Sequence, residues 1–500
     1  MNVYLLNPPF SLNGQEIKKF FRCTRWQGGV TRGGTYWYPI WLAYAAGVLE
    51  KENHNVRLVD APTQDWNYNA VLNDIKRFKP EIIVIDSNFA SLRNDISVAN
   101  ELKELTGSKT ILVGPPVSQF PDEILKKGID IVAKFEYDFT LKDIVDCIEN
   151  GNNLGEIKGI AYNNEGNIIN TPIRPFITSE ELGTLPFVSK VYKDHTGIKD
   201  YFLTHTLYPV VQIFTGRGCP NQCTFCSWPK TLMGRDYRVR SVENIVDEFE
   251  FIIKELPGVR EVFIEDDTFT IKKSRIYEFC QEMKNRELDI TWSCNSRVNL
   301  DYKTMKMMKN SGCRLLDVGF ESGDNRILKN IKKGINTEES LIFMRSARKA
   351  GLLVLADFIF GLPGETKETA EKTINFVKKM QPNMVQFAVA TPIPGTEFYD
   401  WVLDNDYCII DDLNDSIDEN GFQKCIISYP EFNKEDIEFY VNKALKEYYL
   451  SFFYIPTALR TILRKNGFHE LMTMVKSAKI FLEYINMGEN KDEKSKSGME

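Results

Sequence analysis

The sequence predicts an α/β protein with three parts in order along the chain. The first is a doubly wound, Rossmann-like domain, the second is a partial (βα)6 barrel of the TIM type, and the third is a mostly helical C-terminal extension. Short apolar runs alternate with helical patterns in residues 1–145, and the same alternation returns over residues 201–400. With 500 residues, the chain is also too long for one hydrophobic core.

The strands of the first domain are predicted from five short apolar runs: Asn2–Leu6, Val56–Asp60, Glu81–Asp86, Thr110–Gly114 and Asp130–Ala133. Helical patterns separate them at Ile40–Lys51, Tyr68–Phe78, Leu92–Leu105 and Phe139–Glu149. A doubly wound sheet binds its ligand outside the carboxyl ends of the strands. Gly and Pro at such ends let the backbone approach a large flat ligand closely. We therefore expect ligand contacts at Pro8, Pro9, Asp60, Ser87 and Gly114.

Residues 146–200 are expected to form a hairpin and a linker. Ile157–Tyr162 and Ile168–Ile173 flank Asn163-Asn164-Glu165-Gly166, a sequence typical of a hairpin turn. The following stretch, Ser179–Asp200, is polar and irregular, which indicates the linker itself.

The barrel is predicted from six further strand patterns: Val210–Thr215, Glu261–Ile264, Ile290–Cys294, Leu315–Phe320, Val354–Phe360 and Met384–Ala390. Six βα units suit a barrel that stays open on one side, with chemistry at the carboxyl ends of its strands. In the extension, residues 401–487, a helical pattern runs from Lys434 to about Tyr484. The tail, residues 488–500, is charged and poor in apolar residues, so we expect it to be disordered.

Composition narrows the class of protein. The net charge is −7 and the pI is near 5.5, which argues against a nucleic-acid partner because phosphate binding needs a basic face. No run of eighteen apolar residues and no signal peptide are recognised, so we expect a cytoplasmic protein. In that reducing compartment, ten cysteines favour metal or catalytic use over disulfides.

Three cysteines form the most specific motif in the chain. Cys219, Cys223 and Cys226 directly follow a predicted strand, in a loop that contains Gly218 and Pro220. Thiolates are the ligands of iron–sulfur clusters, and three ligands leave one iron of a [4Fe–4S] cubane open. The alternative is zinc or buried thiols, but zinc normally takes a fourth Cys or His, and the nearest histidine is His205. No second compact group of cysteines is present, so we expect one cluster.

The spacing Cys-x3-Cys-x2-Cys, with Phe225 before the last cysteine, resembles the radical S-adenosylmethionine (SAM) superfamily over about residues 209–400. The resemblance implies that the open iron holds the amino and carboxylate groups of SAM, and that reductive cleavage yields a 5′-deoxyadenosyl radical. An external electron donor such as flavodoxin or ferredoxin is implied too. The implied SAM contacts lie at strand ends and beside the cluster, at Phe225, Glu265, Asp266, Asp267, Glu321, Ser322 and Gly361.

The acids after the second barrel strand differ from the usual Gly-Gly-Glu of the superfamily. Carboxylates suit the SAM ammonium group, but the sequence leaves open which of Glu265, Asp266 and Asp267 binds it. Ser293, Asn295 and Arg297, at the end of the third strand, either face SAM or form a surface loop.

A doubly wound domain before such a barrel resembles the cobalamin-binding group of the superfamily. The resemblance implies cobalamin at the five strand-end residues named above, and the alternative is a purely structural domain. The common Asp-x-His-x-x-Gly motif is absent around His54, so no histidine of that motif ligates cobalt. Trp37–Ala43 followed by Leu58–Pro62 looks like a subgroup that includes a radical SAM enzyme of hopanoid biosynthesis. We carry over its cofactor arrangement and not its substrate.

The C-terminal extension raises the question of a membrane surface. The aromatic stretch Tyr448–Tyr454 precedes Thr457–Lys465, which carries Arg460, Arg464 and Lys465. Such a stretch either lies on a membrane surface or packs across the barrel opening. A lipid-linked substrate and peripheral membrane contact therefore stay open beside a small-molecule substrate.

Three functions remain in competition. The first is a cobalamin-dependent radical SAM enzyme that modifies an unactivated carbon, with methyl transfer as the commonest outcome in the group that the sequence resembles. The second is a radical rearrangement, ring contraction or cyclisation of a sugar or lipid-linked substrate without methylation. The third is an iron–sulfur electron carrier or sensor, which the SAM-side motifs at residues 321–323 and 361–365 argue against. No residue is assigned as a catalytic acid or base.

Overall fold

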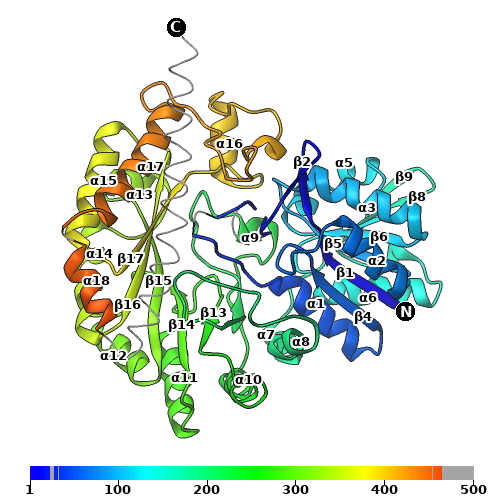
Figure 1. The fold of residues 1–500 in the computed structure, drawn as a ribbon, viewed down its shortest axis with the longest axis horizontal. Coiled ribbons are helices and arrows are strands. Elements are labelled where there is room, and N and C mark those ends of the chain that lie inside the picture. Colours follow the sequence, from blue (N-terminus) through cyan, green and yellow to red (C-terminus); the bar gives the residue numbers. More distant parts are fainter. Residues whose placement is uncertain (23–27, 32, 453, 464–500) are drawn as a thin grey trace.

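The computed structural model of the protein describes residues 1–22, 28–31, 33–452 and 454–463. Figure 1 shows a sheet domain, coloured blue to cyan, beside a half-open barrel, coloured green to yellow, with helix α9 (Trp228–Thr231) between them. The predicted order, a doubly wound domain followed by a partial barrel and a helical extension, is confirmed.

The N-terminal sheet has seven strands in the order β4-β1-β5-β6-β7-β8-β9. The first five are parallel: β1 (Asn2–Asn7), β4 (Asn55–Asp60), β5 (Ile82–Asp86), β6 (Lys109–Val113) and β7 (Ile131–Ala133). Their helices are α1 (Ile40–Lys51), α2 (Tyr68–Phe78), α3 (Leu92–Thr106), α4 (Pro115–Gln119), α5 (Pro121–Lys126) and α6 (Asp138–Glu149). Alternate residues of β1 join opposite layers: Val3 and Leu5 pack with α1 and α6, whereas Tyr4 and Leu6 pack with α2 and α3.

The predicted hairpin belongs to this sheet. After η1 (Leu154–Glu156), strands β8 (Ile160–Asn164) and β9 (Asn167–Asn170) pair antiparallel, and β8 also pairs antiparallel with β7. The expectation of irregular structure after it is wrong, because α7 (Ser179–Thr184) and α8 (Val188–His195) occupy that stretch. A capping box between Thr178 and Glu181 begins α7, and α8 buries three apolar side chains.

The barrel sheet has six parallel strands in chain order, as predicted. They are β10 (Val210–Ile213), β13 (Glu261–Ile264), β14 (Thr291–Ser296), β15 (Cys313–Glu321), β16 (Leu353–Phe360) and β17 (Met384–Val389). The covering helices are α10 (Val242–Glu255), α11 (Lys273–Asn285), α12 (Tyr302–Asn310), α13 (Asn325–Asn330), α14 (Thr337–Ala350) and α15 (Lys367–Met380). A short hairpin, β11 (Gly216–Arg217) and β12 (Arg238–Val239), brackets the cysteine loop and α9.

Two segments outside the sheets also meet. Strands β2 (Phe10–Leu12) and β3 (Gln15–Ile17) form a hairpin that packs with Ile417 of the C-terminal extension. That extension contains α16 (Glu397–Asp404), η2 (Leu413–Asp415), α17 (Lys434–Tyr449) and α18 (Ile455–Ile462). The predicted continuation of helix to Tyr484 and the tail 488–500 lie outside the described residues, as do Cys23, Arg25, Trp26, Arg32, Arg464 and Lys465. Within the described ranges, no helix is long and apolar enough to cross a membrane.

Helix α1 joins the two domains into one core. Its first ten residues, Ile40–Leu49, are all buried, because one side faces the N-terminal sheet and the other faces the barrel. Trp41 contacts the Phe214 ring at 5.4 Å between centroids, and the Tyr44 hydroxyl accepts a 3.1 Å hydrogen bond from Phe214 N. The helix therefore fixes the first barrel strand against the sheet domain.

Candidate cluster, SAM and cobalamin sites

The three motif cysteines lie on the loop between β11 and α9. Cys219 and Cys223 are buried, Cys226 is half-buried, and all three are thiols rather than halves of a disulfide. Gly218 has φ +87°, and a Cβ there would lie 2.0 Å from Asp236 O, so the tight entry to the loop requires glycine. This arrangement offers three sulfur ligands on one short, bent segment.

Two polar side chains approach the sulfur atoms. Asn221 Nδ2 lies 3.2 Å from Cys219 Sγ, and Arg297 Nη1 lies 3.6 Å from Cys223 Sγ. Hydrogen bonds to cysteine sulfur favour the thiolate and tune the potential of an iron–sulfur cluster. The donor set, thiolates with hydrogen-bond donors around them, therefore fits a [4Fe–4S] cluster.

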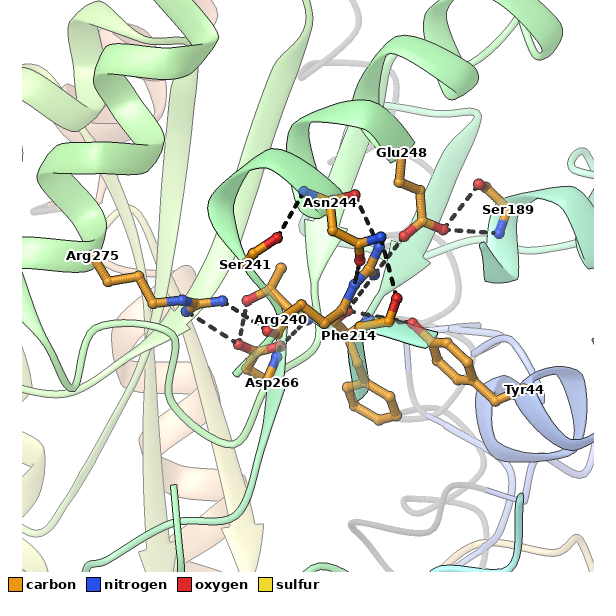
Figure 2. Close-up of polar contacts among 12 residues, drawn as sticks. Tyr44, Ser189, Phe214, Arg240, Ser241, Asn244, Glu248, Asp266 and Arg275 are labelled. Carbon is orange, nitrogen blue, oxygen red and sulfur yellow. Dashed lines mark hydrogen bonds and ion pairs between the residues drawn. The ribbon is translucent and has the colours of Figure 1, made fainter. Parts of the chain in front are cut away.

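The Asp266 carboxylate supports the strand end that precedes the cluster loop. It accepts hydrogen bonds from Thr215 N at 2.6 Å, Thr215 Oγ1 at 2.5 Å and Gly216 N at 3.0 Å. Arg275 lies 4.0 Å from the same carboxylate and donates to Thr215 O (Figure 2). Burial raises the pKa of Asp266 in spite of Arg275. The Asp266 carboxylate is therefore occupied by hydrogen bonds within the protein, mostly to backbone N–H groups.

A second buried network holds the same strand end against α1 and α8. Arg240 donates to Phe214 O at 2.8 Å and to Glu248 Oε2 at 2.5 Å. Glu248 also accepts from the hydroxyl of Ser189 at 2.9 Å. Figure 2 shows Arg240 at the centre of these contacts, with Tyr44 reaching Phe214 from the sheet domain. The cluster loop thus starts from a strand end that is fixed from several sides.

A cavity lies between the two domains. Gln212, Trp228 and Glu265 line it from the barrel, and Arg22 and Asp86 line it from the sheet domain together with residues 37–41. Gln212 Nε2 donates to Glu265 Oε2 at 2.7 Å, so the Glu265 carboxylate faces this cavity. Trp228 is two residues beyond Cys226. The structure therefore brings one acid of the predicted triplet, and the residues next to the cluster loop, to the edge of the other domain.

The carboxyl ends of the N-terminal strands show polar atoms that lack partners. Asn7 Oδ1, Asp86 Oδ1 and Asn88 Nδ2 are buried and form no hydrogen bond with the described residues. Asn7 and Asp60 line a second cavity, which shares Arg22 and Trp37 with the first. Unpaired buried donors and acceptors are costly, so a ligand with both kinds of group is expected there. The amide side chains of a corrin ring supply both, and the site fits cobalamin.

The predicted cobalamin contacts lie at these adjacent strand ends. Pro8 O accepts from Arg22, which is paired with Asp95 at 2.6 Å, and the Ser87 hydroxyl donates to the same Asp95 at 2.8 Å. Pro9 O accepts from Asn94. The backbone of Gly114 lies so close to the backbone of Ser87 that a Cβ on Gly114 would be 2.2 Å from Ser87 O. Asp60 lines the second cavity, and burial raises its pKa to about 6.

His54 lies away from these strand ends. Its ring nitrogens contact Asp146 and the amino group of Met1, at the amino ends of the strands. It is therefore not placed to reach a ligand at the carboxyl ends, in agreement with the absent histidine motif.

The SAM-side residues at the fourth and fifth strands occupy tight turns. Glu321 has φ +67° and accepts a 2.6 Å hydrogen bond from Lys333, and Ser322 lies 3.3 Å from the Thr373 hydroxyl. Gly361 has φ +91°, and its N–H donates to Glu365 at 2.5 Å. A non-glycine residue in the left-handed region, as at Glu321, is a feature that clusters at functional sites. Phe225 is half-buried beside Cys226.

Ser293 and Asn295 lie within β14, Arg297 directly follows it, and the three have separate surroundings. Ser293 is fully buried and donates to Glu261. Asn295 donates to Asp266 O at 2.9 Å and supports the acidic turn. Arg297 contacts Cys223, which places it in the cluster environment. The alternative of a surface loop is wrong for all three, because none is exposed.

Sequence reasoning missed the polar interior of the barrel. On β15 and β16 the outward residues pack with the helices, whereas Leu315, Leu353 and Leu355 form a separate inner cluster. On the same inner faces, Asp317 and Asp357 are half-buried. Burial and the neighbouring Asp317 raise the pKa of Asp357 well above its usual range. The signal in the sequence was an acid within each apolar strand.

These features together define a radical enzyme built from a cluster barrel and a corrin-binding sheet domain. Residues 213–377 match the radical SAM superfamily, and residues 27–145 match the B12 binding domain. An uncharacterised methyltransferase of Pyrococcus horikoshii is 32% identical over 442 residues, which cover 87% of this chain and 92% of the relative. The chain therefore belongs to the radical SAM superfamily, in the group that carries a B12-binding domain. Its cofactors are a [4Fe–4S] cluster, SAM and cobalamin.

Other relatives and solved structures agree. The hopanoid C-3 methylase of Methylococcus capsulatus is 25% identical and matches 72% of this chain and 67% of its own, which confirms the resemblance to that subgroup. The fold is shared with the methyltransferase TsrM of Kitasatospora setae, with a TM-score of 0.66, 16% identity and 89% of each chain covered. It is also shared with the enzyme OxsB, with a TM-score of 0.68, 16% identity, and 96% of this chain and 72% of that chain covered.

Proposed function

We propose that this enzyme transfers a methyl group to an unactivated carbon, with the SAM-side and cobalamin-side residues acting across the cavity between the domains. The observation that carries the proposal is the shared lining of that cavity by Glu265 and Trp228 of the barrel and Asp86 and Arg22 of the sheet domain. Bound here, the cluster and SAM supply a 5′-deoxyadenosyl radical, and cobalamin supplies the methyl group.

The residues of this chain then have distinct roles. Cys219, Cys223 and Cys226 hold the cluster, and Glu265 binds the SAM amine as a charged hydrogen-bond acceptor. The turns at Glu321–Ser322 and Gly361, and Phe225 beside the cluster, contact the rest of SAM. Asn7, Asp86 and Asn88 each have a buried polar atom without a hydrogen-bond partner among the described residues, and these atoms bind the edge of the corrin ring. The aromatic wall of Trp37, Trp41 and Trp228 excludes water from the space where the radical acts.

Named relatives support methyl transfer. The cytidylyl-2-hydroxyethylphosphonate methyltransferase of Streptomyces wedmorensis is 26% identical over 449 residues, which cover 79% of this chain and 80% of the relative. The Pyrococcus and Methylococcus relatives also carry methylation in their names.

The deciding experiment is anaerobic incubation of the reconstituted enzyme with a cell extract and SAM that carries a deuterated methyl group. Mass spectrometry should find an acceptor that has gained the labelled methyl. The matched control is the variant in which Cys219, Cys223 and Cys226 are all alanine, which should lose the cluster and form neither labelled acceptor nor 5′-deoxyadenosine. A product that contains no label in the presence of active SAM cleavage contradicts methyl transfer.

A cyclisation is the second candidate, because the anaerobic magnesium-protoporphyrin IX monomethyl ester cyclase of Rubrivivax gelatinosus is 27% identical over 393 residues. That match covers 74% of this chain and 67% of the relative. The same incubation separates the two reactions, since a cyclised product keeps its number of carbons and carries no deuterated methyl.

The acceptor carries an apolar body. The inner face of the barrel supports this, since a floor of leucines lies below the half-buried carboxyls of Asp317 and Asp357. A lipid-linked acceptor also agrees with the C-terminal stretch, where Leu450, Phe452 and Leu463 are exposed. Cosedimentation of the full chain with anionic phospholipid vesicles tests this contact. The protein staying in the supernatant at low salt favours an acceptor that diffuses freely.

The reaction takes place in the cytoplasm, with flavodoxin or ferredoxin as the electron donor. The described cysteines are thiols and not disulfides, which suits a reducing compartment. Replacement of dithionite by a reduced flavodoxin system should sustain SAM cleavage.

A further inference from the structure

The hairpin that leads into the cluster loop is joined to the sheet domain by a buried ion pair. Arg217 is the last residue of β11, two positions before Cys219. Its Nη1 and Nη2 atoms donate to the two carboxylate oxygens of Asp138, at 2.6 and 3.0 Å. Both side chains are wholly buried. Asp138 is the first residue of α6, after the carboxyl end of β7, so the pair crosses from one domain to the other.

A second arginine of the same hairpin repeats this arrangement. Arg238 pairs with Arg217 across the hairpin and donates to Glu136 Oε2 at 2.7 Å. Glu136 Oε1 in turn lies 3.6 Å from Arg217 Nη1. We call these four residues, Arg217, Arg238, Glu136 and Asp138, the interdomain clamp. Two cations of the cluster hairpin thus face two anions of the sheet domain.

The clamp also contacts the wall of the interdomain cavity. The Arg217 guanidinium carbon lies 4.2 Å from the centre of the Trp41 ring, within reach of a cation–π interaction. Trp41 lines the same cavity as Asp86 and Glu265. One side of Arg217 therefore supports the cavity wall, while its backbone leads directly to the first cluster cysteine.

Stability alone is a poor explanation for such a group. Removing charges from water is costly, and well-packed apolar residues often replace a buried ion pair without loss of stability. A bidentate arginine–carboxylate pair instead fixes distance and orientation, because its two parallel hydrogen bonds tolerate little displacement. The clamp is therefore suited to fix the distance and orientation of one domain relative to the other.

We propose that the clamp positions the cluster loop relative to the corrin-binding strand ends, and so sets the separation between the cluster and the cobalt. Arg217 and Asp138 are positioning residues, since they act through the loop and the cavity wall. This role goes beyond the proposed methyl transfer and holds for a cyclisation as well, because both need the two cofactors at a defined distance.

The test measures that distance. Enzyme reconstituted with cluster and cob(II)alamin is reduced, and pulsed dipolar EPR records the coupling between the reduced cluster and the cobalt. The variants are Arg217→Lys, which keeps the charge but not the bidentate geometry, and the isosteric Asp138→Asn. The matched control is Arg314→Lys, since Arg314 forms a buried pair with Glu261 inside the barrel, and this pair does not cross between the domains.

We expect a narrow distance distribution in the wild type and in Arg314→Lys. In Arg217→Lys and Asp138→Asn, the distribution should broaden or move, with the iron and cobalamin contents unchanged. A wild-type distribution in both clamp variants overturns the proposal. Loss of either cofactor from both variants overturns it as well, because the clamp would then be required for folding and not for placement.

Discussion

Glu265 and Asp266 are neighbours in the chain, but their carboxylates have different surroundings. Glu265 faces the interdomain cavity, whereas Asp266 accepts three hydrogen bonds from Thr215 and Gly216. We predict that Glu265→Gln weakens SAM binding by about 1.5–3 kcal/mol, as expected for a lost charged hydrogen bond, without a change in melting temperature. SAM titration and thermal unfolding of the cluster-loaded variant measure both effects.

The substitution Asp266→Asn, at the next position, should affect folding stability. An amide places a donor where the carboxylate accepts, so we expect a loss of folding stability of about 1–3 kcal/mol. A Glu265 variant with wild-type SAM affinity would mean that the amine is held by another group, and an Asp266 variant of unchanged stability would mean that the strand end does not depend on it.

Arg297 provides a second prediction at the scale of single residues. Its guanidinium contacts Cys223 Sγ and Lys333 O. A positive hydrogen-bond donor beside a cluster ligand stabilises the reduced state, which carries more negative charge. Arg297→Met should therefore lower the cluster midpoint potential by on the order of 60 mV, a tenfold change for a one-electron couple. An EPR-monitored redox titration measures the shift, with the surface variant Arg286→Met as a control that should keep the wild-type potential.

Asp86 makes the stability of the cobalamin-free protein depend on pH. Burial raises its pKa from 3.8 to about 8, so the folded protein keeps a proton that the unfolded chain releases. Stability from this group is present at low pH and is lost as pH rises through the range between those two values, by up to about 1.4 kcal/mol per pH unit. Asp86→Asn should make that decline shallower, and the other buried acids whose pKa is raised, Asp60 and Glu365 among them, account for the slope that remains. Denaturant unfolding across this range gives the slopes, and parallel curves for the two proteins would contradict the assignment.

At the scale of elements, the close approach of β6 to β5 depends on one glycine. A Cβ on Gly114 would lie 2.2 Å from Ser87 O and 2.6 Å from Asp86 Oδ1. Gly114→Ala should push these strand ends apart and reduce cobalamin retention through desalting. Gly107→Ala is the matched control, since Gly107 also has a positive φ, but a Cβ there would meet no atom of the described residues within 4 Å. Equal losses of cobalamin in both variants would mean that backbone strain, and not contact, is responsible.

Elements that depend on local pattern were predictable from the sequence. The strands were short, continuous apolar runs between helical patterns, and both α1 and α2 have the predicted bounds. The apolar residues of α2 recur with the helical period, whereas α1 is a longer run of apolar residues that is buried on both sides. Helices α7 and α8 were missed because the stretch is short, polar and interrupted by Pro186. Helix α8 packs against α1 and α10, and such tertiary packing is not visible in a local pattern. The capping box at Thr178 and Glu181 was the local signal for α7.

Features that depend on distant pairs were not predictable. The cluster loop follows from three cysteines within eight residues, but Arg217 and Asp138 are 79 positions apart, and neither stands out in its own segment. The choice between Glu265 and Asp266 likewise depends on which of them meets Thr215, a contact across 51 positions. The predicted SAM and cobalamin contacts stay predictions, which the Glu265→Gln and Gly114→Ala variants test.

At the scale of the whole molecule, one hydrophobic core runs through both domains. Residues of β1, α1, the barrel strands and α17 belong to the same buried cluster. Such a shared core couples the two domains, and we expect thermal unfolding of the cofactor-free protein to be a single transition with no separate melting of the sheet domain. Differential scanning calorimetry should find a calorimetric enthalpy equal to the van't Hoff enthalpy.

Trp41 is the residue at which this coupling is best tested, because it lies between Tyr137 of the sheet domain and Phe214 of the barrel. Trp41→Ala should cost about 3–5 kcal/mol, typical of a large-to-small change in a core, and should split the transition in two. Trp292→Ala is the matched control, since Trp292 is equally buried but packs within the barrel, against Phe269 and Phe279. It should lower the melting temperature without a second transition. Two resolved transitions in the wild type would show that the domains unfold independently and that the shared core does not couple them.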